Sequence, residues 1–192
     1  MGSFYRPVHG QGPTASCGVA LLARPGISVA PVTTESIGFY VPRSPRYGLW
    51  LVDGGFMGGH VVAILYLEDS SGMGETNMAI LEQLASLLWA LKKPFCIMAD
   101  WDNEPEAFKG SGWVDSIGGT IVESGRPTCL QGDTARVYDY CVVSSHWLVP
   151  PTATLYEPWA PGPHTGILIE VPWNQPRVLV EVLRKPKTFP ER

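Results

Sequence analysis

The sequence predicts a single α/β domain, an α/β sandwich in which strands outnumber helices. Hydrophobic residues make up 45% of the 192 residues, which is enough for a sizeable core. Short apolar runs alternate with turn-forming stretches, as expected for a chain with 21 Gly and 18 Pro. One long amphipathic segment lies between these runs, so a helix is expected to connect strands of a sheet.

The first part of the chain is predicted to contain a flexible segment and three strands. Residues 1–16 are polar and contain Gly and Pro, so we expect a flexible N-terminal segment. The run at 17–25 is predicted to be a first buried strand that ends at Pro25. The runs at 47–55 and 58–68 are predicted to form a hairpin. Their Gly-rich connection lacks the Gly-Lys-Ser/Thr ending of a phosphate loop and leads into a strand, so it favours the hairpin.

The spacing of apolar residues predicts a helix over 75–93. Its apolar residues recur at i, i+3 and i+4 and form one face: Ile80, Leu81, Leu84, Leu87, Leu88 and Leu91. Lys92 and Lys93 suit the negative end of the helix dipole, and Pro94 ends the helix.

Further strands are predicted after this helix. They are residues 94–100, 119–124, 136–145, 152–158 and 166–171. From residue 172 to 192 the sequence is a Pro-rich C-terminal tail, in which 177–183 could add an edge strand.

Composition and charge exclude some broad classes of function. The net charge of −4 and the pI near 5.5 give no global attraction to nucleic acid or to an anionic membrane. No apolar run reaches the ~20 residues that a membrane-spanning helix needs, and no secretory signal is visible. The four cysteines form no Cys-x-x-Cys pair, and Cys96 and Cys141 are expected to be small buried hydrophobes. We therefore expect an intracellular protein, cytoplasmic or nuclear.

A cluster of polar residues follows the strand at 94–100. In an extended strand Asp100 and Asp102 would point to one face and Trp101 to the other. Two carboxylates on one face repel unless a cation or a proton relieves them, so a metal or catalytic site is one interpretation. A polar loop that caps the turn at 105–108 is the alternative. A calcium loop is excluded because Pro105 stands where such a loop needs Gly.

Two later residues favour a site. Asp139 lies within an apolar strand, where a lone carboxylate is costly unless it has a partner. His164 immediately precedes another apolar strand. An Asp that accepts a hydrogen bond from one ring nitrogen of a His fixes its tautomer and raises its basicity.

The order of these segments resembles the endonuclease/exonuclease/phosphatase superfamily. The segments are VVAILYLEDSSG, the long helix, PFCIMADWDNEPE, RPTCLQGDTARVYDYCVVS and GPHTGILIEV. The superfamily includes deoxyribonucleases, apurinic and retroelement endonucleases, inositol polyphosphate phosphatases and sphingomyelinases. The resemblance covers residues 17–171 and implies a partial domain: a four-layer α/β/β/α sandwich that lacks its first strands.

The resemblance assigns roles to five residues. Asp100 matches the Asp that orients or activates the attacking water, and Asp102 stands where an Asn donates to the scissile phosphate. Tyr66 matches a Tyr that contacts the phosphate. Asp139 matches the Asp that holds the catalytic His, and His164 matches that His. A Mg²⁺ ion is implied, with Asp100 and Asp102 as its candidate ligands.

Three departures from the family pattern imply impaired catalysis. An ionised Asp102 can only accept hydrogen bonds, so it cannot replace an Asn amide. Pro163 stands where the family has an Asp before the His. The Asn and the metal-binding Glu of the family's first strands should precede residue 17, and residues 1–16 contain neither. Glu35 and Glu68 come too late in the order to be that Glu.

These observations favour a nuclease- or phosphatase-like chain that is truncated and weakly active or inactive. An active Mg²⁺-dependent nuclease or phosphatase is the alternative if the natural chain extends upstream. A non-catalytic binding module is a second alternative, with exposed Trp and Tyr residues as its partner surface; Trp89 is instead expected to pack in the core or at an edge. Possible partners are nucleic acid or another phosphate ester. Without its first strands the domain would expose an apolar sheet edge, so marginal stability is expected.

Overall fold

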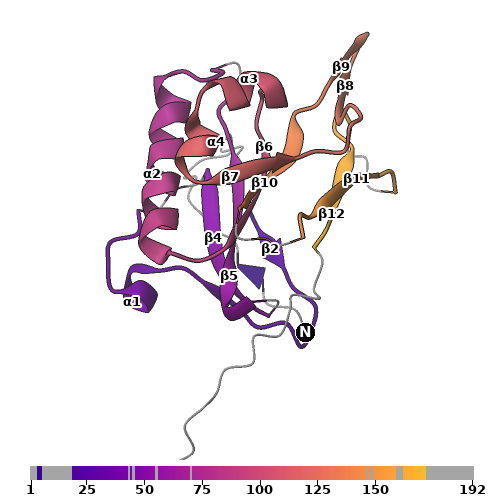
Figure 1. The fold of residues 1–192 in the computed structure, drawn as a ribbon. Helices are drawn as coiled ribbons and strands as arrows, with labels where there is room; N and C mark the ends of the chain where they lie inside the picture. The colour runs from indigo at the N-terminus through magenta and orange to yellow at the C-terminus, as the bar shows by residue number, and fades with distance from the viewer. Residues whose placement is uncertain are drawn as a thin grey trace, which may run out of the picture.

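A six-stranded sheet forms the centre of the molecule (Figure 1). The computed structural model describes residues 4–5, 19–42, 44, 46–54, 56–69, 71–145, 147, 149–158 and 162–171. The strand order in the sheet is β3-β4-β5-β6-β10-β7. Its strands are β3 (Val29–Pro31), β4 (Tyr47–Gly54), β5 (Phe56–Tyr66), β6 (Phe95–Asp100), β10 (Asp139–Ser144) and β7 (Gly119–Val122). β5 and β6 are parallel, whereas the other neighbouring pairs are antiparallel.

Helix α2 (Glu75–Leu91) connects the parallel strands β5 and β6 and covers one face of the sheet (Figure 1). The predicted apolar face packs on the sheet, because Leu81, Leu84, Leu87 and Leu88 are all buried. The helix ends at Lys92, which has a left-handed backbone conformation and donates its N–H to the carbonyl of Leu88. Three short helices accompany it: α1 (Thr34–Ile37), α3 (Pro105–Gly110) and α4 (Trp113–Ser116).

An aromatic cluster on the helix side fixes the end of β6. The buried Trp101 stacks on Tyr140 of β10 at 5.4 Å between ring centroids, and Phe108 and Trp113 pack beside it. The indole N–H of Trp101 donates to the carbonyl of Tyr140 at 3.1 Å. Because Trp101 directly follows Asp100, this cluster anchors the point where the polar cluster begins.

Pairs of short strands lie on the other face of the sheet. These are β1 (Phe4–Tyr5) with β2 (Leu21–Leu22), β8 (Cys129–Gln131) with β9 (Thr134–Arg136), and β11 (Thr152–Tyr156) with β12 (Gly166–Glu170). Ile169 of β12 packs against a second apolar cluster formed by Cys96, Cys141, Val143 and Trp147. The described residues thus form a helix layer, a central sheet and a layer of paired strands (Figure 1). This arrangement confirms the predicted α/β sandwich.

Most of the predicted strands are present, but three predictions are wrong. Of the buried strand predicted at 17–25, the described residues 19–25 form a strand only at Leu21–Leu22, which pairs with β1 rather than with the central sheet, and Leu22 is 64% exposed. The turn at 105–108 is the start of helix α3. Trp89 is 68% exposed on α2, because it lies on the face of the helix opposite the buried leucines.

The predictions for the two ends of the chain fall largely outside the described residues. Of residues 1–16 the structure describes Phe4–Tyr5, and the tail at 172–192 is not among the described residues. No helix in the described part of the chain is both long enough and apolar enough to cross a membrane.

Candidate functional site

Asp100 and Asp139 lie side by side at one end of the central sheet. Asp100 is the last residue of β6, Asp139 is the first residue of β10, and the two are direct partners in the antiparallel pairing. Side chains alternate along both strands, so these two carboxylates project from the face opposite the helices. Their side chains are 25% and 19% exposed. The site is therefore a partly covered rim rather than an open surface.

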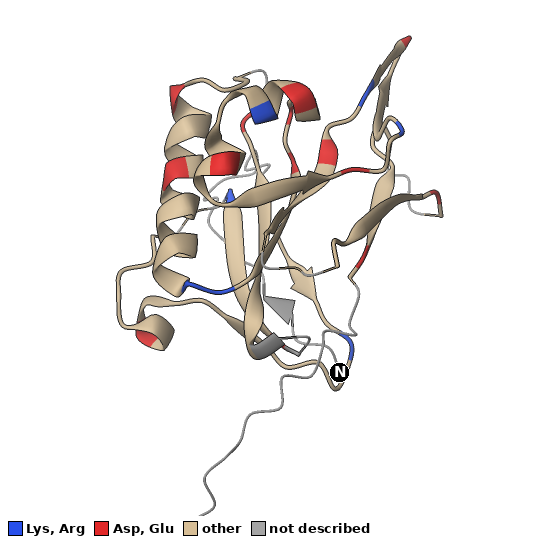
Figure 2. Ribbon diagram, in the orientation of Figure 1, with Lys and Arg blue, Asp and Glu red and all other residues tan. Residues whose placement is uncertain are grey.

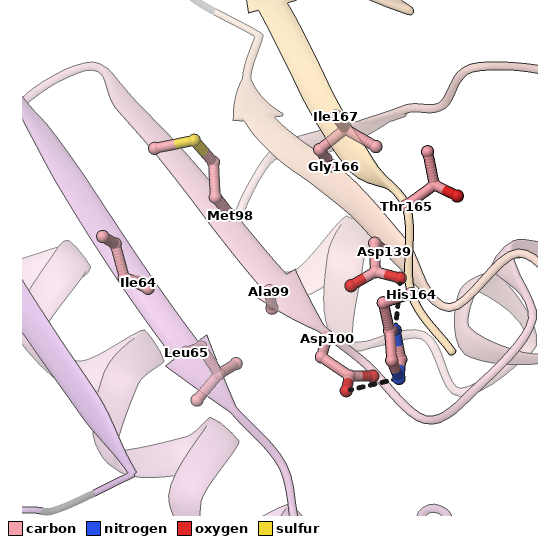
Figure 3. Close-up of a pocket in the computed structure, with 10 residues that line it drawn as sticks. All are labelled: Ile64, Leu65, Met98, Ala99, Asp100, Asp139, His164, Thr165, Gly166 and Ile167. Carbon is pink, nitrogen blue, oxygen red and sulfur yellow. Dashed lines mark hydrogen bonds and ion pairs between the residues drawn. The ribbon is translucent and has the colours of Figure 1, made fainter. Parts of the chain in front are cut away.

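His164 lies between the two carboxylates (Figure 3). Its Nδ1 is 2.8 Å from Oδ2 of Asp139, and its Nε2 is 3.8 Å from Oδ2 of Asp100. A carboxylate only accepts, so the short contact assigns a proton to Nδ1. Burial lowers the pKa of His164, but the hydrogen bond to Asp139 and the charges of Asp139 and Asp100 outweigh it and raise the pKa overall. Asp139 thus fixes the tautomer and the orientation of the imidazole of His164.

Asp100 carries a charge that its surroundings disfavour. Burial raises its pKa, and the charge of Asp139 raises it further, although His164 acts in the opposite direction. A cation would relieve this repulsion. Asp100, Asp139 and His164 each offer a ligand atom within 4.8 Å of the others, and together they are placed to hold a metal ion.

Thr128, which sequence analysis did not single out, holds this site together. It is fully buried, and its hydroxyl oxygen accepts hydrogen bonds from the backbone N–H groups of Tyr138 at 3.0 Å and Asp139 at 2.9 Å. Its carbonyl accepts from the N–H of Thr165 at 2.7 Å. Thr128 thus links the segment that carries Asp139 to the segment that carries His164. The sequence shows only a Thr in a loop, and it reveals neither the burial of this side chain nor its partners.

Asp102 does not lie beside Asp100 in the way that strand alternation predicts. β6 ends at Asp100, and Asp102 has a left-handed backbone with φ of 48°. Its backbone N–H donates to Oδ1 of Asp100 at 3.3 Å. Asp102 is not in the group of ligand atoms described above, whose third member is Asp139. Asn103 donates from its side-chain amide to the carbonyl of Trp101 at 2.9 Å, which stabilises the same turn.

Tyr66 lies on the other side of Asp100. It is the last residue of β5 and pairs with Asp100 in the parallel register. The guanidinium carbon of Arg46 lies 5.4 Å from the centroid of the Tyr66 ring. Sequence analysis did not identify Arg46, because it precedes β4 without any motif.

A cavity of about 270 Å³ opens next to the carboxylates (Figure 3). Asp100, Asp139 and His164 form its polar end. Its remaining wall is largely apolar and is lined by Ile64, Leu65, Met98, Ala99, Thr165, Gly166 and Ile167. A cavity of mainly apolar lining with a few converging polar groups is typical of a ligand-binding site.

Several solved structures share this fold. The endonuclease domain of TRAS1, a telomere-specific non-LTR retrotransposon, superposes with a TM-score of 0.68 at 11% identity, covering 88% of this chain and 78% of that domain. The cytolethal distending toxin of Actinobacillus actinomycetemcomitans gives a TM-score of 0.51 at 10% identity, covering 79% of this chain and 62% of that one.

An endonuclease/exonuclease/phosphatase family protein from Bacteroides thetaiotaomicron gives a TM-score of 0.50 at 12% identity, covering 81% of this chain and 65% of that one. This chain thus spans less than two thirds of the toxin and of the Bacteroides protein. No protein-family model matches the sequence, and neither does any curated protein. Through these structural matches, the chain is shown to have the endonuclease/exonuclease/phosphatase-type fold.

Proposed function

We propose that this chain hydrolyses a phosphoric ester at the cluster formed by Asp100, Asp139 and His164. The observation that carries this proposal is the convergence of the three residues, which are distant in sequence, with 2.8 Å between His164 and Asp139. The raised pKa of Asp100 and of His164 supports it, because perturbed groups that face a cavity are characteristic of functional sites.

Each residue has a chemical role in this proposal. Asp139 holds the imidazole of His164 with its Nδ1 protonated, so that Nε2 faces the substrate, and a protonated Nε2 would donate to an oxygen on phosphorus. Asp100 lies across from Nε2 and accepts a proton from the attacking water. As the water oxygen bonds to phosphorus, the bond to the ester oxygen breaks, and the leaving oxygen takes a proton from solvent. A Mg²⁺ ion held by Asp100, and by Asp102 if its side chain turns toward the site, would supply charge stabilisation to the phosphoryl oxygens.

We expect the rate of hydrolysis to be low. Asp102 in the position of the family's Asn would repel a phosphate oxygen instead of donating to it, and loss of one such donor typically costs about a hundred- to a thousand-fold in rate. Asn103 does not replace that donor, because its amide is bonded to the carbonyl of Trp101. A chain that binds phosphate esters without turnover is the second candidate, and the acceptor-only Asp102 is the observation that favours it.

The test is a Mg²⁺-dependent hydrolysis assay on bis(p-nitrophenyl) phosphate and on plasmid DNA. Hydrolysis is expected to require Mg²⁺ and to be abolished in His164→Ala and Asp100→Asn. Asp115→Asn is the matched control for the second variant, since Asp115 is an exposed carboxylate on α4. Residual hydrolysis that His164→Ala leaves unchanged would refute the proposed site, and a complete lack of turnover would favour the binding protein.

A further inference from the structure

A row of four residues crosses the sheet at the rim that carries the proposed site. The backbone N–H of Tyr66 donates to the carbonyl of Arg46 at 2.8 Å, which continues the pairing of β4 with β5. Tyr66 in turn pairs with Asp100, and Asp100 pairs with Asp139. Directly opposed residues of neighbouring strands project to the same face. Arg46 therefore lies at the rim, and its backbone is two strand spacings, ~10 Å, from the backbone of Asp100.

Arg46 is held in place but remains accessible. Its guanidinium lies 5.4 Å from the centroid of the Tyr66 ring, a cation–π contact. Nη1 donates to the carbonyl of Leu67 at 3.4 Å, and Nη2 is 3.8 Å from the carboxylate of Glu68. The side chain is 26% exposed. These long contacts engage two of the five N–H donors of a guanidinium, so donors remain for the oxygens of a ligand.

The charges around the rim favour Arg46 as a cation that contacts a bound phosphate. Acidic segments lie at the end of the sheet where β6 ends and β10 begins (Figure 2). Asp100 and Asp139 are among them, and an anionic substrate meets their repulsion. Arg136, another described cation near this end of the sheet, forms an ion pair with Glu104 at 3.6 Å. A planar guanidinium at one end of the row offsets the repulsion and binds phosphate with two parallel hydrogen bonds.

We infer that Arg46, supported by the ring of Tyr66, forms a subsite for a second phosphate, adjacent to the phosphate that is attacked beside His164. A subsite of this kind is displaced from the hydrolytic residues. It favours a substrate with consecutive phosphodiesters, an oligonucleotide strand, over an ester with a single phosphate. This inference rests on the proposed function for the identity of the attacked phosphate. Binding at Arg46 itself does not require hydrolysis.

Binding of a short fluorescein-labelled oligothymidylate, measured by fluorescence anisotropy, tests the subsite without requiring turnover. Arg46→Met keeps the packing of the side-chain stem on Tyr66 and removes the guanidinium. It is expected to weaken binding about ten- to a hundredfold, the effect of losing a hydrogen bond to a charged group. The slope of log K against log salt concentration is expected to become shallower by about 0.7, the value for one phosphate contact on a single strand.

Two further variants separate the subsite from general effects. Arg24→Met removes an exposed cation near the opposite end of the sheet and is expected to leave affinity and salt slope unchanged. Arg46→Lys keeps the charge but not the fork, so it is expected to retain the salt slope with intermediate affinity. Since Lys preserves the local charge balance with Glu68, this variant stays informative if Arg46→Met does not fold.

The outcomes distinguish the subsite from the proposed activity. If Arg24→Met binds the oligonucleotide as the parent does and Arg46→Met does not, the subsite stands even when no hydrolysis is found. If Arg46→Met binds with parental affinity and salt slope, the inference is wrong. If the parent hydrolyses bis(p-nitrophenyl) phosphate but does not bind the oligonucleotide, the proposed function stands and the inference fails.

Discussion

At the scale of single residues, the side chain of Asp102, and not its backbone, limits the hydrolytic centre that we propose. Its φ of 48° places it in the left-handed region, which Asp and Asn adopt more readily than other non-glycine residues. The turn therefore accepts either residue without added strain. The difference between them is chemical, because the carboxylate only accepts hydrogen bonds and the amide also donates them.

Replacement of Asp102 by Asn is therefore expected to increase hydrolysis. The amide would supply a donor to the phosphate, and it would also remove a negative charge that contributes to raising the pKa of Asp100. The rate is expected to rise by up to about a hundredfold, the lower end of the range for one transition-state donor. Initial rates on bis(p-nitrophenyl) phosphate in saturating Mg²⁺ measure this effect.

The double variant Asp102→Asn, His164→Ala is the control. It should be as inactive as His164→Ala alone, because the new donor acts at the same phosphate as the imidazole. An unchanged rate in Asp102→Asn would show that residue 102 does not face the substrate, and a lower rate would show that its carboxylate is needed, as expected of a Mg²⁺ ligand.

At the scale of elements, the parallel pair β5 and β6 explains why the rim is at this end of the sheet. α2 connects the two strands, so both end at the same edge, and their last residues are Tyr66 and Asp100. Ligands bind in α/β sheets outside the carboxyl ends of such strands. Periodicity predicted these elements because each is long enough to display it.

The elements that sequence analysis missed are short. β3, α1, α4 and the β8–β9 hairpin have three or four residues in each segment, too few to show a period of 2 or 3.6. The contacts that build the site are also invisible in the sequence. Thr128 reaches Asp139 across eleven positions, and Arg46 reaches Tyr66 through strand pairing. The residue types were predictable, but their spatial neighbours depend on the register.

Thr128→Val tests the link between β10 and the segment that carries His164. Valine has the same shape without the hydroxyl, so two backbone N–H groups lose their acceptor in a buried position. Each unpaired donor costs about 1–3 kcal/mol, and the free energy of unfolding is expected to fall by at least ~2 kcal/mol. The pKa of His164, followed by NMR, is expected to fall because Asp139 is no longer held against it.

Thr128→Ser is the matched control for that variant. It keeps the hydroxyl and loses one methyl group, at a cost of about 1 kcal/mol, and the pKa of His164 should stay as in the parent. Equal effects of Val and Ser on this pKa would mean that Thr128 contributes packing but does not position the pair.

At the scale of the whole molecule, the raised pKa of Asp100 predicts that its charge lowers the stability of the folded protein near neutral pH. The folded protein brings Asp100 and Asp139 together at a partly buried rim, and the unfolded chain separates them. Groups whose charge the fold disfavours cluster at functional sites, and structural ion-pair networks perturb pKa values as well. The ionisation of Asp100 is therefore expected to contribute to the pH dependence of the free energy of unfolding.

The raised pKa of Asp100 determines whether its contribution to stability rises or falls with pH. The folded state raises the pKa of Asp100 above its ordinary value of 3.8, chiefly through burial and then through the charge of Asp139. Between 3.8 and the raised value the folded state holds this proton more tightly than the unfolded chain. The contribution of Asp100 to stability is thus fully present below 3.8 and is lost as pH rises through the raised pKa.

Asp100→Asn, which cannot ionise, is therefore expected to be more stable than the parent near neutral pH and equal to it below pH 3.8. Urea unfolding at several pH values measures the difference. Asp139→Asn is the contrasting variant, because it weakens the 2.8 Å hydrogen bond to His164 and is expected to destabilise the protein at neutral pH. If Asp100→Asn is less stable than the parent at neutral pH, the carboxylate is a structural partner of His164, and the fold does not hold an unfavourable charge at Asp100.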